Sequence, residues 1–107
     1  MKIFNIRDFY QKEYQEYIIG SREIERHSVY FVYGEIPANG IRQMGAPEGH
    51  EEILYLLSGE ALLESRGVEK QLAREQAVFM ANEPFTFTAL TECRYVVAGA
   101  HTMVHNH

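Results

Sequence analysis

Hydrophobic and polar residues alternate over short stretches of this chain, and glycines or other turn residues separate one stretch from the next. Alternation with a period of two over about four to eight residues predicts β-strands. We expect strands over residues 2–6, 27–36, 41–44, 52–57, 60–65, 68–72, 77–80, 85–89 and 95–100. Short strands joined by frequent turns are typical of an all-β sandwich or barrel.

The segment over residues 8–20 has a different pattern. Tyr10, Tyr14 and Tyr17 are spaced as residues on one side of a helix would be. An aspartate before them is a suitable N-cap, and Gly20 is a suitable end. The sequence leaves open whether this segment forms a short helix.

One predicted strand is apolar on both faces. Residues 53–57 read Ile-Leu-Tyr-Leu-Leu, whereas a strand with one solvated face carries polar residues at alternate positions. One face of this strand fills the interior, so the other face needs a cover as well. Because large exposed apolar patches are uncommon on monomers, we predict that the protein is a homodimer.

Length and charge narrow the class of protein. The 107 residues suffice for one domain, and a net charge of -5 argues against a nucleic-acid partner, because phosphate attraction dominates that affinity. No apolar run approaches the ~20 residues of a transmembrane helix, and Arg7 and Asp8 interrupt any signal sequence, so we expect no membrane partner. Cys93 is the only cysteine, which is consistent with a cytoplasmic location.

Two regions carry a family resemblance. In the first, Gly40, Glu52 and Gly59 stand at the spacing of motif 1 of the cupin superfamily. In the second, residues 72–90, the run Ala-Val-Phe-Met at 77–80 and the turn Asn-Glu-Pro at 82–84 resemble motif 2. The resemblance implies an all-β cupin jelly-roll β-barrel (a double-stranded β-helix) with a pocket inside. It divides the chain into a segment over residues 1–26 that packs on the barrel, the barrel itself over 27–100, and a tail over 101–107 that we expect to fray.

The resemblance also implies a metal site that this chain departs from. Cupin metal sites use two histidines and a glutamate from motif 1 and one histidine from motif 2. Depending on the register, the first two histidine positions fall at Ala46 and Glu48, or at Met44 and Ala46, and the third falls at Phe85, or at Thr86 under strict spacing. Only Glu52 is kept. We therefore expect no cofactor and no metal in the usual site.

Other residues offer replacements for the lost ligands. Glu48, His50 and Glu52 share one parity and would face the same way on a straight strand, giving a weak site for a divalent metal. His101 ends the last predicted strand near the pocket mouth, whereas His105 and the final residue lie in a tail that is a poor metal frame.

His50 and Glu52 have two further interpretations. In a pocket they form a pair that could move protons in an isomerase or lyase reaction. On a solvated loop they have no chemical role. The hydroxyls of Tyr30, Tyr33 and Tyr55 line either the pocket or a dimer interface, and the sequence does not separate these.

We predict that the barrel binds a small-molecule ligand without the usual metal. A barrel that has lost its metal ligands keeps an apolar pocket with a few polar groups, and the expected lining comprises Glu48, Leu54, Leu56, Phe85 and Phe87. The alternative is an enzyme, with His50 and Glu52 as its catalytic pair or with an altered metal-ligand set. A third possibility is a structural role of the dimer surface.

Overall fold

The structure is a computed structural model and describes residues 1–102 of the chain. These residues form ten strands, one 3-10 helix and one α-helical turn. Their bounds are η1 Ile6–Phe9, β1 Tyr10–Gln11, β2 Glu16–Ile19, α1 Ser21–Ile24, β3 Val29–Ile36, β4 Ile41–Met44, β5 His50–Ser58, β6 Ala61–Ser65, β7 Val68–Leu72, β8 Ala77–Met80, β9 Phe85–Ala89 and β10 Cys93–His101. No helix among the described residues is long and apolar enough to cross a membrane.

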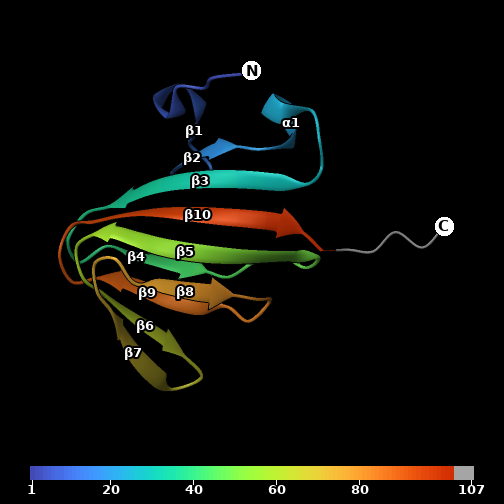
Figure 1. The fold of residues 1–107 in the computed structure, drawn as a ribbon. Helices are drawn as coiled ribbons and strands as arrows, with labels where there is room; N and C mark the ends of the chain where they lie inside the picture. The colour runs from blue at the N-terminus through green and yellow to red at the C-terminus, as the bar shows by residue number, and fades with distance from the viewer. Residues whose placement is uncertain (103–107) are drawn as a thin grey trace.

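The strands form two antiparallel sheets. The larger has the order β1-β2-β3-β10-β5-β8, and the smaller has the order β4-β9-β6-β7. Figure 1 shows the N-terminal elements beside β3 at one edge of the larger sheet and the β6–β7 hairpin at the other end of the molecule. From β3 to β10 the chain passes repeatedly between the two antiparallel sheets, with only β6 and β7 consecutive in one sheet, and this fits the predicted jelly roll.

The predicted strands agree with the observed ones from residue 29 onward, apart from shifts of one or two residues at some ends. The opening strand predicted over residues 2–6 is wrong: residues 1–5 are irregular, and η1 begins at Ile6, where the Asn5 side chain accepts a hydrogen bond from the Arg7 amide. The open question over residues 8–20 is resolved without an α-helix, because β1 and β2 pair with each other and β2 then pairs with β3.

The core lies between the two sheets. The largest fully buried side chains come from both of them: Tyr95, Phe87, Ile36, Leu54, Leu56 and Cys93. In β5 the alternation is clear, because Leu54 and Leu56 are buried whereas Ile53 and Leu57 are 51% and 40% exposed. The larger sheet therefore has an apolar inner face and, unusually, an outer face that is apolar too.

Two glycines let tyrosine rings cross neighbouring strands on the inner face. Gly34 of β3 pairs with Tyr95 of β10, and Gly99 of β10 pairs with Tyr30 of β3. A methyl group added at Gly34 would overlap the Tyr95 ring, and one added at Gly99 would overlap the Tyr30 ring. Each ring thus lies over the backbone of the opposite strand, which positions its hydroxyl one strand further along the sheet.

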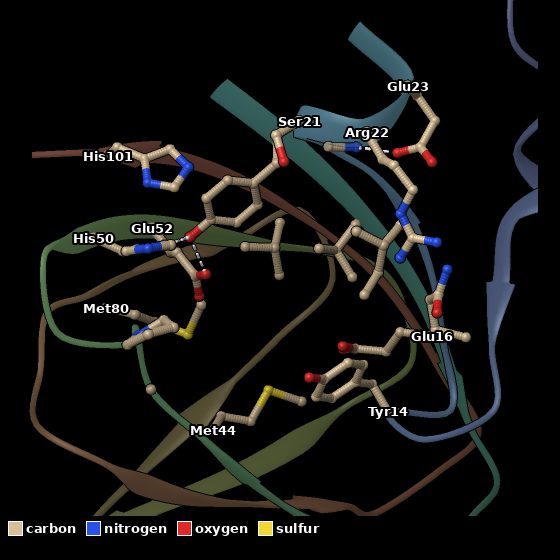
Figure 2. A pocket seen from close by; sticks show the side chains of 18 of the residues that line it. Tyr14, Glu16, Ser21, Arg22, Glu23, Met44, His50, Glu52, Met80 and His101 are labelled. Atoms are coloured by element: carbon tan, nitrogen blue, oxygen red, sulfur yellow. Dashed lines mark hydrogen bonds between the residues drawn. The ribbon is translucent and has the colours of Figure 1, made fainter. Parts of the chain in front are cut away.

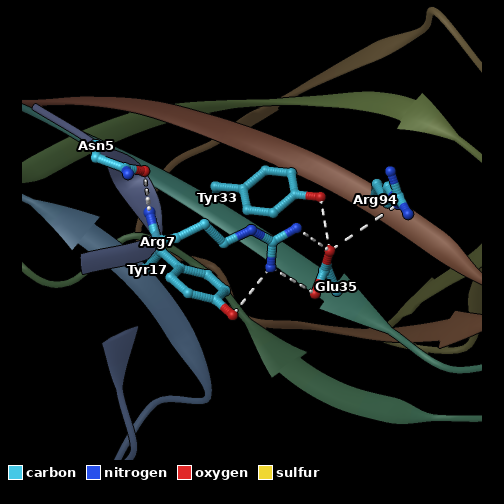
Figure 3. A network of polar contacts seen from close by, with 6 residues as sticks. All are labelled: Asn5, Arg7, Tyr17, Tyr33, Glu35 and Arg94. Carbon is cyan, nitrogen blue, oxygen red and sulfur yellow. Dashed lines mark hydrogen bonds and ion pairs between the residues drawn. The ribbon is translucent and has the colours of Figure 1, made fainter. Parts of the chain in front are cut away.

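The N-terminal segment is fastened to the outer face of the sheet by one arginine. Arg7 donates hydrogen bonds of 3.3 Å and 2.9 Å to the Glu35 carboxylate and one of 3.0 Å to the Tyr17 hydroxyl (Figure 3). Its guanidinium lies 5.0 Å from the Tyr17 ring centroid and 5.4 Å from that of Tyr33, within the range of a cation–π contact. Hydrogen bonds from Arg7 and Tyr33 lower the pKa of Glu35. This network holds β2 against β3, and β2 forms one wall of the cavity described below.

The crossing at Gly34 yields a stability prediction. Gly34→Ala forces a methyl group against the fully buried Tyr95 ring, so we expect it to lower the free energy of unfolding by about 1–3 kcal/mol, as overpacking does. Gly20→Ala is the matched control, because its methyl group would make only ordinary contacts, the nearest at 3.6 Å to Tyr30 Cβ. Equilibrium unfolding in urea measures both. Equal stability of the two variants would show that the close crossing is not a constraint.

Candidate functional site

A cavity of about 630 Å³ opens at one end of the barrel, between the inner face of the larger sheet and the segments that cover it. Its apolar floor is formed by Ile18, Val32, Met44, Met80 and Val97. Three of these follow one another across the sheet, since Ile18 pairs with Val32 and Val32 pairs with Val97. The polar lining lies around this floor, and Figure 2 shows it from close by.

One end of the cavity carries a hydrogen-bonded group of three side chains. The Tyr30 hydroxyl donates to the Glu52 carboxylate and lies 2.9 Å from His50 Nδ1. His50 and Glu52 are alternate residues of β5, so both point inward, and Tyr30 reaches them from β3 by crossing over Gly99. The close-up shows His50, Glu52 and His101 together at this end (Figure 2).

The three groups can satisfy one another in only one way while Glu52 is ionised. A tyrosine hydroxyl has a single hydrogen, and Tyr30 donates it to the Glu52 carboxylate. His50 Nδ1 must then donate to the Tyr30 oxygen, and in the neutral imidazole the lone pair is then on Nε2. Burial, and then the hydrogen bond to Glu52, raise the pKa of the Tyr30 phenol above its ordinary value. The phenol therefore stays protonated and works as a bridge.

A second imidazole lies beside this group. The His101 ring centroid is 4.3 Å from that of His50 and 5.8 Å from that of His27. Loss of solvent, followed by the nearby His50 and His27, lowers the pKa of His101. His101 therefore favours its neutral form and offers a ring nitrogen that can accept a hydrogen bond at the cavity wall.

A second carboxylate faces the cavity from its other end. Glu16 of β2 accepts a hydrogen bond from Tyr95, the ring that crosses over Gly34, and Arg42 donates to the same hydroxyl at 2.9 Å. Burial raises the pKa of Glu16, while the Tyr95 hydrogen bond and the charge of Arg42 act against that rise. Figure 2 places Glu16 near Tyr14, away from His50 and Glu52.

The residues predicted from sequence are only partly brought together. His50 and Glu52 line the cavity, whereas Glu48 is exposed in the loop before β5, because Gly49 has a positive φ of 79° and ends the shared parity. Leu54, Leu56 and Phe87 have no exposed surface and belong to the core beneath the cavity.

Two of the alternative histidine positions, Met44 and Phe85, are occupied by side chains that pack. Phe85 is partly buried against the core and stands directly opposite Met44, which lines the cavity. Tyr30 faces the cavity, whereas Tyr33 and Tyr55 lie on the outer face of the sheet. Of the three tyrosines whose placement the sequence left open, only Tyr30 therefore lines the pocket.

The residues around Glu52 do not fit the metal site that the resemblance implies. In the two registers that the resemblance allows, the histidine positions hold Ala46 with Glu48 or with Met44, and Phe85 or Thr86, and the Glu52 carboxylate accepts a hydrogen bond from Tyr30. Within residues 1–102 no three histidine, cysteine, aspartate or glutamate side chains come together as a metal site would require. The histidines predicted in the tail at 105 and 107 lie outside the described residues.

Sequence reasoning missed the N-terminal half of the site. Lining residues come from β1, β2 and α1 and the turns between them: Gln11, Tyr14, Glu16, Ile18, Ser21, Arg22 and Glu23. The sequence left the conformation of residues 8–20 open, so these side chains could not be assigned to the pocket. A signal did exist at Gly34 and Gly99. A glycine inside a strand leaves a gap at a position where a buried strand usually carries a side chain.

Comparisons with known proteins identify the fold. The chain matches no protein-family model and no curated protein. Among solved structures it resembles ectoine synthase from P. lautus, with a TM-score of 0.75, 12% identity, and coverage of 97% of this chain and 80% of that one. It also resembles a cupin protein from Bacteroides fragilis, with a TM-score of 0.66, 13% identity and coverage of 92% and 89%. A cupin domain of an XRE-family transcriptional regulator from Enterobacter cloacae matches with a TM-score of 0.60, 17% identity and coverage of 75% and 87%. The chain therefore has the fold of the cupin superfamily.

Proposed function

We propose that this protein binds a small molecule in the cavity of its cupin barrel, without a metal in the usual site. The observation that carries the proposal is the combination of an apolar floor with a convergent polar wall of Tyr30, His50 and Glu52 in one concave space. Small-molecule sites have this composition, because apolar surface supplies affinity and a few placed polar groups fix orientation. A volume of about 630 Å³ also lies within the usual range for such sites.

Filling the cavity tests this proposal. Val32→Phe places a larger side chain on the floor, and Gln43→Phe places one at the rim, where folding is less at risk. We expect both to abolish the thermal stabilisation that the best compound from a screen of small polar molecules gives to the unmodified protein. Val29→Phe is the matched control, since Val29 lies on the same strand as Val32 but is 58% exposed on the outer face.

Two results would count against binding in this cavity. One is a screen in which no compound shifts the melting temperature or the amide resonances of cavity residues. The other is a bound compound whose affinity both cavity-filling variants retain.

A second candidate function is metal-free acid–base catalysis, which the order of the three hydrogen-bonded side chains favours. His50 Nε2 carries the free lone pair and would accept a proton from a bound substrate, as a general base does. The proton on Nδ1 can then pass to the Tyr30 oxygen as the phenol hydrogen moves to Glu52. The positive charge that would otherwise develop on the imidazole is thereby transferred and neutralised at the carboxylate. Such a relay suits an isomerase or a lyase, whose reactions begin with removal of a proton.

The relay requires a direct bond between Tyr30 and Glu52, and a titration can detect it. Glu52→Gln removes the negative charge beside the phenol, so we expect the pKa of Tyr30 to fall toward its ordinary value, though not fully, because burial remains the larger cause of the rise. Alkaline titration followed by NMR, with Tyr30→Phe identifying the signal, measures the shift. Tyr33, whose pKa is raised by burial and Glu35, should not respond. An unchanged pKa of Tyr30 would mean that the hydrogen bond between Tyr30 and Glu52 does not form.

We also propose that the protein is a homodimer that pairs through the outer face of the larger sheet. On this face Phe31, Ala98, Ile53 and Phe79 form one continuous row across β3, β10, β5 and β8. Phe31, Ile53 and Phe79 are 41%, 51% and 60% exposed, which is unusual for a row of large apolar side chains.

Charge at the ends of this face favours a second copy as the cover. Glu51 stands at one end, and Arg94 with the Arg7–Glu35 pair stands at the other. A two-fold axis that lies between the two outer faces, parallel to the sheets and perpendicular to their strands, reverses the strand direction, so the acidic end of one copy would meet the basic end of its partner. An apolar centre with a charged rim is the usual anatomy of such an interface.

Two charge substitutions test the dimer. Ile53→Lys with Phe79→Lys places two ammonium groups at the centre of the proposed interface, and we expect sedimentation velocity to change from dimer to monomer. Val68→Lys, at an apolar residue that is 58% exposed on the smaller sheet, is the control and should sediment as the unmodified protein does. A monomeric unmodified protein at high micromolar concentration would contradict the proposal.

The single cysteine bears on location. Cys93 is a buried free thiol whose pKa is raised by loss of solvent, so it resists oxidation and behaves as a small core residue. This supports, as a proposal, the cytoplasmic location expected from the sequence.

A further inference from the structure

Two carboxylates face the cavity and are held in the same way. Glu52 accepts from Tyr30, which crosses Gly99, and Glu16 accepts from Tyr95, which crosses Gly34. The two arrangements are related by the antiparallel pairing of β3 and β10, in which each strand contributes one glycine and one tyrosine. Each carboxylate therefore has a fixed position, one on β5 and the other on β2, with the apolar floor between them.

Neither carboxylate is balanced by a direct ion pair. The ion pairs among residues 1–102 involve Glu25, Glu35 and Glu83, and none includes Glu16 or Glu52. Arg42 approaches Glu16 only through the Tyr95 hydroxyl, and Arg22 is exposed at the rim of the cavity. The Glu52 charge contributes to the raised pKa of Glu16, so the two acids act on each other across the cavity.

The space between the carboxylates is apolar and has aromatic walls. Ile18, Val32 and Val97 form the floor, and Tyr14 and Tyr30 present rings to the same cavity. Aliphatic carbons pack well on such a floor, and tyrosine faces attract cations. The cavity thus offers separate places for an apolar chain and for positive charge.

We propose that the ligand of this cavity is a small aliphatic diamine whose two ammonium groups pair with Glu16 and Glu52, with its carbon chain on the valine and isoleucine floor between them. This inference rests on the proposed function and adds the chemical class of the ligand. Two partly buried carboxylates without direct ion pairs are costly, and an ammonium group beside each of them offsets that cost. An anion would meet repulsion from both carboxylates, and a neutral compound would leave them unpaired.

A series of probes of one length tests the charge requirement. The compounds 1,5-diaminopentane, 5-aminopentan-1-ol, pentane-1,5-diol and glutarate keep a similar chain while the charge passes from positive through neutral to negative. Titration calorimetry and 1H–15N NMR of the full chain measure affinity and locate each probe. We expect the diamine to bind at least about tenfold more tightly than the diol, because a hydrogen-bonded charge pair contributes more than a neutral one.

Two isosteric variants and one control assign the effect to the cavity. Glu16→Gln and Glu52→Gln each remove one negative charge but keep a side-chain oxygen that accepts the hydrogen bond of the tyrosine hydroxyl. Each should weaken diamine binding about tenfold. Glu51→Gln removes the same charge from the exposed face of the same strand, one residue from Glu52, and should leave the affinity unchanged.

The outcomes separate this inference from the proposed function. Diol or glutarate binding as tightly as the diamine, with both cavity variants unaffected, would overturn the amine while leaving small-molecule binding intact. Equal weakening by Glu51→Gln and Glu52→Gln would also overturn it, because the attraction would then come from the general negative charge of the chain. Failure of every compound of the wider screen to enter the cavity would remove the proposed function as well.

Discussion

The site depends on the close crossing of tyrosine rings over glycines in the β3–β10 pair. Without a Cβ at Gly34 and Gly99, the rings of Tyr95 and Tyr30 lie against the neighbouring backbone and reach acceptors beyond it. A side chain at either glycine would occupy the space of the ring. The same two contacts therefore close the packing of the inner face and fix the positions of both cavity carboxylates.

The two cavity carboxylates are held by hydrogen bonds from tyrosine hydroxyls. In a metal site the ion itself supplies the positive charge that makes acidic ligands tolerable. Here neutral phenols donate to Glu16 and Glu52, which gives each carboxylate one hydrogen bond but no compensating charge. No buried side-chain nitrogen or oxygen in residues 1–102 lacks a partner. The two cavity carboxylates are therefore oriented by hydrogen bonds but take part in no direct ion pair within residues 1–102.

The inner face of the larger sheet lines the cavity, whereas its outer face carries exposed apolar side chains. Alternation along β5 sends His50 and Glu52 toward the cavity and Ile53 toward the outer face, so one strand serves both. The N-terminal segment joins the two, because Arg7 anchors it on the outer face while Glu16 and Ile18 face inward from β2. A change in the packing of this edge would therefore alter the positions of residues on both faces of the sheet.

Local pattern determined most of the strands and the fold. Alternation and glycine turns were enough to predict an all-β sandwich or barrel, because alternate residues of a strand face opposite sides. The jelly roll was implied by the family resemblance that Gly40, Glu52 and Gly59 carry. The pair His50 and Glu52 was also visible, since residues two apart on a strand share a face.

The conformation of residues 8–20 was not determined by the sequence, because its tyrosine spacing suits a helix and only pairing of β2 with β3 makes it a strand. Tertiary structure alone decided that Tyr30 joins His50 to Glu52 and that Tyr95 donates to Glu16. These contacts connect residues 20, 22 and 79 positions apart, and no local pattern records which distant glycine leaves room for which ring.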